Sequence, residues 1–265
     1  MAEHPHILAK NFLEEATVSG SGFSEHPIYK LEYMADLSRM SKWEGGLASS
    51  QQRITWSFIA GARSVDTFVF DRNFDLTGSA PTVTLQYADS PAGPWTTAQK
   101  EGGGSLVLGG LDSAKTYWQP LAPVTKTHWS LLLDGLAGMQ RPPSIFNVWL
   151  GERIALSFGP YGEFDPYEEE VVGDSVHGAS GGFQWTQRFR RRVLRAFFEN
   201  LSDSQYALLV GWWIEAAREG KNWWWLTFPA SEPEDALYLN CEGLPRRFAL
   251  TSTVRRGTIE AREVI

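Results

Sequence analysis

Three consecutive tryptophans, Trp223, Trp224 and Trp225, lie in the stretch "KNWWWLTFP" at 221–229. Successive side chains of a strand point to opposite faces, and three neighbours in a helix point in three directions. A simple amphipathic element therefore covers two of these rings at most. The stretch predicts a strand covered on both faces, either by two layers of this chain or by one layer and a second molecule.

The composition is that of a folded protein with much aromatic contact surface. Of the 265 residues, 43% are hydrophobic and 13% aromatic, and twelve are tryptophan. Buried aromatic side chains dominate both cores and interfaces, so we expect more contact surface than a solitary monomer needs. The net charge of −7 argues against a general affinity for nucleic acid or for anionic membranes.

The single cysteine, Cys241, excludes an intramolecular disulfide and a thiolate metal cluster. The N-terminal segment lacks the apolar core of a signal peptide. No run approaches the roughly 20 apolar residues of a membrane span. We therefore expect synthesis in the cytoplasm and no membrane anchor.

The first half of the chain has the pattern of an all-β domain. Short runs rich in Val, Thr, Phe and Tyr are separated by Gly, Pro, Asn or Asp, which indicates strands joined by turns. No helical period of convincing length occurs between 50 and 156, and a β-sandwich is the natural architecture. The predicted strands are 53–60, 64–72, 81–90, 125–136 and 144–156, with a glycine-flanked loop and short strand at 101–111.

Several segments of this half resemble discoidin-like, galactose-binding-type jelly rolls. The opening "NFLEEATVSGSG" (11–22) is similar to the start of such domains, and "RSVDTFVFDRNFDLTGSAPTVTLQYADSP" resembles the version found in phage tail proteins. The segment "HWSLLLDGL" and the strand that ends in "VWLGERIAL" are similar to the closing pair of strands. The resemblance covers about residues 7–156 and implies a sandwich whose loops often bind glycans.

The last third has a different order of elements. Apolar and polar residues alternate over "GFQWTQRFRRRVLRAFF" (182–198), with Trp185, Phe189 and Val193 on one face. This predicts a strand that is either unusually long or bent into two. A helix follows at 201–222, with a capping box of Ser202 and Gln205. Its predicted inner stripe holds Tyr206, Leu209, Val210, Trp213 and Ala217, and Gly220 ends it. Four further strands are predicted within 223–229, 236–243, 246–254 and 257–265. We expect Trp224 and one of its two neighbours to fill the gap between the helix and the sheet, alongside Trp213.

This order resembles the tail-tube-type domain of phage minor tail, distal tail and baseplate proteins. The resemblance rests on a long strand that leads into "F-x-x-L-S-x-x-Q" (Phe198 to Gln205) and on a strand between Gly220 and Pro229. It covers about residues 182–265 and implies a helix packed on an antiparallel sandwich, with long strands that join neighbouring subunits into a ring. The family's channel is usually acidic, whereas this strand carries Arg188, Arg190 and Arg192 on its polar face, so that face is expected to meet an acidic partner. Glu168–Glu170 of this same chain are candidates.

Residues 157–181 are rich in Gly, Pro and acidic side chains and predict a linker or extended arm. Its carboxylates, from Asp165 to Asp174, lie close to His177 in the sequence. A glycosidase holds two carboxylates at a fixed separation on rigid elements, so we interpret this acidic run as a charge-complementary arm. The N-terminal "HPH" (4–6) could bind a metal adventitiously, but a disordered terminus is the expectation. We expect no catalytic residue, metal site or cofactor.

Trp43 and Trp95 are the candidate glycan contacts, because an exposed ring can stack on a sugar. Trp118 and Trp129 could do the same. For each of these tryptophans we favour the other interpretation, namely that Trp118 and Trp129 are core residues and that Trp95 caps a hairpin.

Together these observations predict a mainly β protein with a discoidin-like β-sandwich at 1–156, a linker or arm at 157–181, and an α+β tail-tube-like domain at 182–265. The resemblances imply a structural component of a phage tail tip, located in the virion, that assembles as a trimeric or hexameric ring. It would connect the tail tube to hub and fibre proteins, with DNA only in transit through its channel. The alternative is a glycan-binding module that contacts the host surface. The expected subunit-interface residues are Trp223, Trp225, Arg188, Arg190, Arg192, Phe164 and Tyr167.

Overall fold

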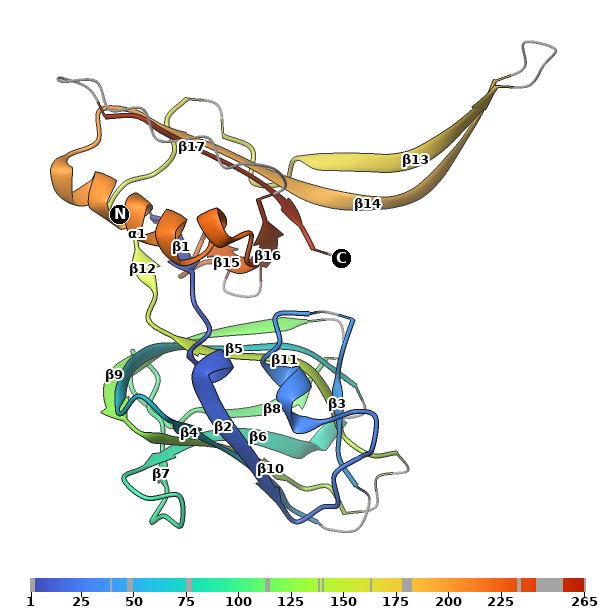
Figure 1. The fold of residues 1–265 in the computed structure, drawn as a ribbon, viewed down its shortest axis with the longest axis vertical. Coiled ribbons are helices and arrows are strands. Elements are labelled where there is room, and N and C mark those ends of the chain that lie inside the picture. Colours follow the sequence, from blue (N-terminus) through green and yellow to red (C-terminus); the bar gives the residue numbers. More distant parts are fainter. Residues whose placement is uncertain are drawn as a thin grey trace. The chain divides into compact units, whose positions relative to one another are not determined.

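The chain forms two compact units, which are described separately (Figure 1). The computed structural model describes residues 3–38, 40–46, 50–74, 78–112, 115–137, 139, 141–162, 164–177, 183–232, 235–241 and 255–264. The first unit, here called the arm unit, comprises Met1–Ala9, Ile154–Ala230 and Leu237–Ile265. The second, the sandwich unit, comprises Lys10–Arg153 and Ser231–Ala236.

The boundary between the units differs from the predicted 1–156. The short strand β1 (His6–Leu8) pairs with β12 (Ile154–Ala155), so that His6 lies opposite Ala155. Both strands belong to the arm unit. In the sequence, the sandwich unit is therefore an insertion between two paired strands of the arm unit. The expectation of a disordered N-terminus is wrong for β1, because Ile7 and Leu8 are buried.

The sandwich unit consists of two antiparallel sheets. Leu131 on one sheet lies opposite both Ile54 and Leu85, and all three side chains are buried. They join Phe68 and Val148 of the other sheet in one apolar cluster, which confirms the predicted mainly β fold with a β-sandwich. The first sheet has the order β2 (Ala16–Ser21), β4 (Gln52–Phe58), β10 (His128–Asp134), β6 (Gly78–Ala88) and β7 (Thr96–Thr97), with β8 (Val107–Leu111) also on β6. The second has the order β3 (Trp43–Glu44), β11 (Ser144–Gly151), β5 (Arg63–Phe74) and β9 (Thr116–Lys126).

The predicted strands of this half are confirmed, with small shifts at their ends. The sequence pattern missed β9 because two prolines, Pro120 and Pro123, lie inside it. Two 3-10 helices, η1 (Phe12–Glu15) and η2 (Leu31–Met34), contribute Leu13 and Met34 to the sandwich core.

The arm unit is built on a seven-stranded sheet with one α-helix among its described residues. The sheet order is β12, β1, β15 (Trp223–Leu226), β16 (Ala236–Asn240), β17 (Gly257–Glu263), β14 (Phe183–Phe198) and β13 (Glu169–His177). The strands predicted within 223–229, 236–243 and 257–265 are confirmed, and the one at 246–254 lies outside the described residues. β13 falls inside the predicted linker, so 169–177 is a paired strand instead.

The helix α1 (Asp203–Glu215) begins as predicted, but it ends before the predicted stop at Gly220. Ser202 accepts a hydrogen bond from the Gln205 N–H, and the Gln205 side chain accepts one from the Ser202 N–H, which completes the capping box. A short 3-10 turn, η3 (Ala217–Glu219), follows and ends at Gly220, whose φ of 66° is left-handed. Leu209 and Ala217 of the predicted inner stripe are buried, and Tyr206 and Trp213 pack against the same apolar cluster. Trp212, which the predicted stripe did not contain, is buried as well.

The three tryptophans of β15 are completely buried within the chain. Trp223 meets Trp212 of α1 with ring centroids 4.9 Å apart, and Trp225 belongs to the same apolar cluster. Trp224 alternates to the opposite face, where its ring lies 4.7 Å from that of Tyr238. The expectation that Trp224 faces the helix is therefore wrong. The expectation that Trp223 and Trp225 face a neighbouring subunit is wrong as well, because both point to the helix side.

Candidate functional site

The hairpin of β13 and β14 extends past the rest of its sheet (Figure 1). Residues 193–198 of β14 pair with β17, whereas the preceding part of β14 pairs with β13 alone. We call this two-stranded part, 169–177 with 183–192, the hairpin ribbon. β13 ends the sheet order, so among the described strands its outer edge has no partner.

A β-bulge divides the hairpin ribbon. Val172 lies opposite Phe189, but the next residue, Gly173, lies opposite Gln187, which leaves Arg188 as the extra residue. Side chains that lie directly opposite each other share a face, and neighbours along a strand do not. Trp185, opposite Ser175, therefore lies on the face of Gly173, and Phe189 lies on the other. The prediction that Trp185 and Phe189 share one face is wrong because a bulge shifts the alternation by one residue.

Both faces of the hairpin ribbon expose apolar side chains to solvent. Trp185 is 47% exposed, Val171 43% and Phe189 40%. The Trp185 ring covers Gly173 so closely that a Cβ on this glycine would lie 2.8 Å from the ring and 2.5 Å from the Thr186 carbonyl oxygen. Glycine is therefore the residue that lets Trp185 lie flat against the ribbon.

The arginines of β14 pair with acidic residues of this same chain. Arg190 lies 3.5 Å from Glu169 and Arg191 lies 3.0 Å from Glu170, while Arg188 pairs with Asp174. Two further pairs, Arg195 with Glu168 and Arg192 with Glu263 (3.8 Å), continue the pattern. Of the three arginines predicted to meet Glu168–Glu170, Arg190 does so through Glu169, whereas Arg188 pairs with Asp174 and Arg192 with Glu263. Glu168 and Glu170 pair with Arg195 and Arg191 instead.

The three predicted interface arginines are placed differently from the expectation. Arg190 and Arg192 share a face of β14, and the bulge separates Arg188 from them. Because each has an acidic partner in its own chain, they present a nearly neutral surface to a neighbour. Solvent-exposed pairs of this kind contribute little to stability, about 1 kcal/mol at most.

The two aromatic residues predicted at the interface differ in exposure. Phe164 packs against the apolar cluster of the arm unit. Tyr167 is half exposed, and its backbone N–H donates a hydrogen bond to Asp165 over 2.8 Å. Tyr167 thus exposes about half of its surface to solvent, whereas Phe164 packs within the chain.

The candidate glycan contacts of the sandwich unit also differ from one another. Trp43 is completely buried, so the expectation that it contacts a sugar is wrong. Trp118 and Trp129 are buried too. Trp95 is half-buried, and the Arg53 guanidinium lies 5.0 Å from its ring centroid, which covers part of the ring in a cation–π contact.

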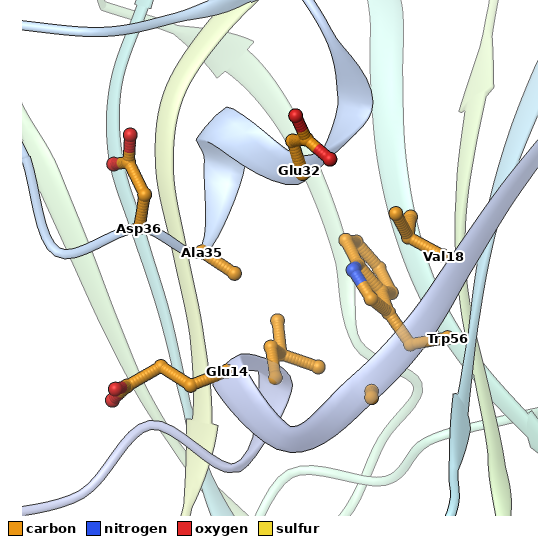
Figure 2. Close-up of a pocket in the computed structure, with 8 residues that line it drawn as sticks. Glu14, Val18, Glu32, Ala35, Asp36 and Trp56 are labelled. Atoms are coloured by element: carbon orange, nitrogen blue, oxygen red, sulfur yellow. The ribbon is translucent and has the colours of Figure 1, made fainter.

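A groove runs beside β2, the edge strand of the first, larger sheet of the sandwich unit (Figure 2). Its first part has a volume of about 250 Å³ and an apolar floor of Leu13, Val18, Ala35 and Trp56. Its second part, about 410 Å³, shares Val18 and Glu32 with the first. We call the two parts together the β2 groove.

Carboxylates line the β2 groove, and none of its described lining residues is Lys, Arg or His. Glu14, Glu32 and Asp36 stand around the first part, and Glu25 lines the second. No motif in the sequence marked these residues, because they come from separate turns that only the fold brings together.

Cys241, the single cysteine of the chain, is buried in the arm unit. Burial raises the pKa of the Cys241 thiol to about 11, against an opposing hydrogen bond from Trp223. In the described part of the chain, no group of three or more His, Cys, Asp or Glu side chains is placed to hold a metal ion. Within the same part, no helix is both long and apolar enough to cross a membrane.

No protein-family model matches this chain, and no curated protein matches it. Solved structures give partial matches. A chitosan-binding module from a Paenibacillus sp. IK-5 chitosanase/glucanase is 12% identical, with a TM-score of 0.43 over 54% of this chain and 99% of the module. A putative alpha-L-fucosidase from Bacteroides thetaiotaomicron is 15% identical, with a TM-score of 0.43 over 55% of this chain and 29% of the fucosidase. A Clostridium perfringens protein solved with GalNAc-beta-1,3-galactose is 14% identical, with a TM-score of 0.42 over 55% of this chain and 99% of that protein. All three TM-scores are below 0.5, and the likeness decides nothing about function.

Proposed function

We propose that this chain is a structural protein of a phage or phage-derived tail tip that assembles with copies of itself through the hairpin ribbon. The observation that carries the proposal is the ribbon itself. Nine residues of β14 pair with β13 as their single partner strand among the described residues, and Trp185 and Phe189 are exposed on opposite faces. A two-stranded hairpin is marginally stable in water when it packs against nothing. A second layer supplied by a neighbouring copy would cover these side chains.

The edges of the ribbon support the same proposal. An unpaired strand edge is a template for pairing with another chain, and natural proteins usually shorten it or cover it. β13 has nine residues and ends its sheet. If the ribbon of each copy packs on the next copy, and the rotation that relates neighbouring copies closes on itself, the copies form a ring. The role is structural rather than catalytic, because the carboxylates of 168–174 are held in ion pairs.

The place of such a ring in a tail tip rests on the resemblance of 182–265 to tail-tube-type domains. None of the three solved structures compared above is a tail protein. In this proposal the ring joins the tail tube to hub and fibre proteins, surrounds the DNA channel, and is located in the virion.

Light scattering after size-exclusion chromatography tests the assembly, with particle images to show whether a ring forms. We expect the wild-type protein to form a closed oligomer, and the double variant Trp185→Ser/Phe189→Ser to remain a folded monomer. The matched control is Ile28→Ser/Ile59→Ser, which removes two exposed apolar side chains from the sandwich unit and leaves assembly intact. A wild-type protein that stays monomeric at every concentration overturns the proposal.

A second candidate function is glycan binding by the sandwich unit. The observation that favours it is the β2 groove, which combines an apolar floor with carboxylates at its rim. Sites for small ligands have this character, with few polar groups around an apolar lining. A glycan array with the wild-type protein and a variant of the groove, Glu32→Gln, tests this function. Binding that survives the substitution would place the glycan elsewhere, with Trp95 as the remaining candidate.

A further inference from the structure

The floor of the β2 groove contains an indole N–H without a partner. Trp56 is 1% exposed, and Figure 2 shows its ring nitrogen facing the groove. No described residue accepts a hydrogen bond from this nitrogen. This N–H opens onto the groove, where water or a ligand accepts its hydrogen bond.

Glu32 stands above Trp56 at the first part of the groove (Figure 2), and it also lines the second part. The other carboxylates have partners. Asp36 accepts hydrogen bonds from the Ser38 N–H (2.9 Å) and the Ser41 hydroxyl, and Glu25 accepts one from the Leu31 N–H (3.2 Å). Glu32 forms no ion pair or side-chain hydrogen bond with the described residues. It is therefore the carboxylate available to a ligand.

The charge of the groove selects among ligands. A cleft lined by charges of one sign attracts the opposite charge and raises its local concentration. The carboxylates around the β2 groove have no described cation beside them in its lining, so an anionic ligand is repelled and a cationic one is favoured. Leu13 and Ala35 form an apolar floor. The ligand that fits is therefore a small molecule that carries its positive charge beside an apolar face.

We propose that the β2 groove binds an amino sugar with a free amine. The ammonium group pairs with Glu32, a ring or hydroxyl oxygen accepts the hydrogen bond of Trp56, and the C–H face of the pyranose packs on Leu13 and Ala35. The first part of the groove, about 250 Å³, has room for one sugar ring, and the second part takes a neighbouring ring of an oligomer. This inference rests on the second proposed function and names its ligand; it is independent of assembly by the hairpin ribbon.

The test uses three β-1,4-linked trimers that differ at one position of each ring: glucosamine, N-acetylglucosamine and glucose. Calorimetry with the full chain is expected to show binding of the glucosamine trimer and at least about tenfold weaker binding of the other two. Glu32→Gln is expected to lose about tenfold in affinity for the amine, the factor that corresponds to 1.4 kcal/mol. The amine binding is also expected to weaken as salt is added.

Two further samples make the outcomes decisive. Glu152→Gln removes an exposed carboxylate of the sandwich unit that lines neither part of the groove, and it is expected to bind as the wild type does. Trilysine carries the positive charge without a sugar, and equal binding of trilysine overturns the sugar assignment. Equal affinity for all three trimers overturns the amine preference and leaves glycan binding standing. The absence of binding to any trimer overturns both.

Discussion

Trp212 of α1 and Trp223 of β15 meet edge to face, with ring centroids 4.9 Å apart and ring planes at 69°. This contact joins the helix to the sheet of the arm unit, and it shows which face of β15 the helix covers. Trp225, two residues further, lies on the same side, with its centroid 6.3 Å from that of Trp223. The tryptophan stretch is therefore core on both faces, and the exposed tryptophan of this unit, Trp185, lies on the hairpin ribbon instead.

Trp223→Ala is expected to destabilise the protein by about 3–5 kcal/mol, the usual cost of removing a large aromatic side chain from a core. The control is Tyr161→Ala, which removes an aromatic ring that is 62% exposed and lies outside the hairpin ribbon, and it is expected to cost about 1 kcal/mol or less. Urea unfolding followed by circular dichroism measures both changes. Equal costs for the two variants would contradict the assignment of core and surface.

Two glycines of the helical segment are expected to respond in opposite directions to alanine. Gly220 has a φ of 66°, where a Cβ is strained, so Gly220→Ala is expected to cost about 1 kcal/mol. Gly211 lies within α1, and a Cβ there meets nothing within 4 Å, so Gly211→Ala is expected to stabilise by about 0.5–1 kcal/mol. Thermal unfolding of the two variants measures both stability changes. A stabilised Gly220→Ala variant would show that the helical segment does not end in a left-handed turn at Gly220.

Gly173→Ala is expected to disturb the hairpin ribbon without unfolding the rest of the chain. The added Cβ would collide with the Thr186 carbonyl oxygen, which is backbone and cannot move away alone. We expect faster amide hydrogen exchange in 169–177 and 183–192, unchanged exchange in α1, and loss of assembly. Unchanged exchange in the ribbon would refute the packing of Trp185 on Gly173.

Stability is expected to fall at alkaline pH through Cys241. The thiol has a pKa of about 11 in the folded chain, and an unfolded thiol has a pKa of about 8.5. As the pH rises above about 8.5, the unfolded chain releases this proton first, so unfolding becomes more favourable. The contribution of the neutral thiol is complete below this pH and is lost as the pH rises through about 11.

Urea unfolding of wild type and Cys241→Ala between pH 8 and 10.5 measures this contribution. Other groups titrate in both proteins, so the difference between the two curves reports the thiol. The wild type is expected to lose more stability over this range than the variant does. Parallel curves would mean that Cys241 is more accessible to solvent than its burial indicates.

The sequence by itself determined the elements that depend on near neighbours. The capping box of α1 joins residues three apart, Gly220 needs no distant partner for its left-handed turn, and most strands follow from their local alternation. The pairing of Glu168–Glu170 with the arginines of β14 was also foreseeable, because the two charged runs complement each other within a short length of chain.

Only the tertiary structure decided which faces these elements cover and which distant segments they meet. The pairing of β1 with β15 joins residues more than two hundred positions apart, and no local pattern encodes it. The bulge opposite Gly173 shifts every side chain beyond it to the other face, which alternation alone cannot reveal. The β2 groove likewise gathers Glu14, Glu32 and Trp56 from separate elements. Burial and pairing depend on the whole packed chain, whereas caps and turns depend on a few neighbouring residues.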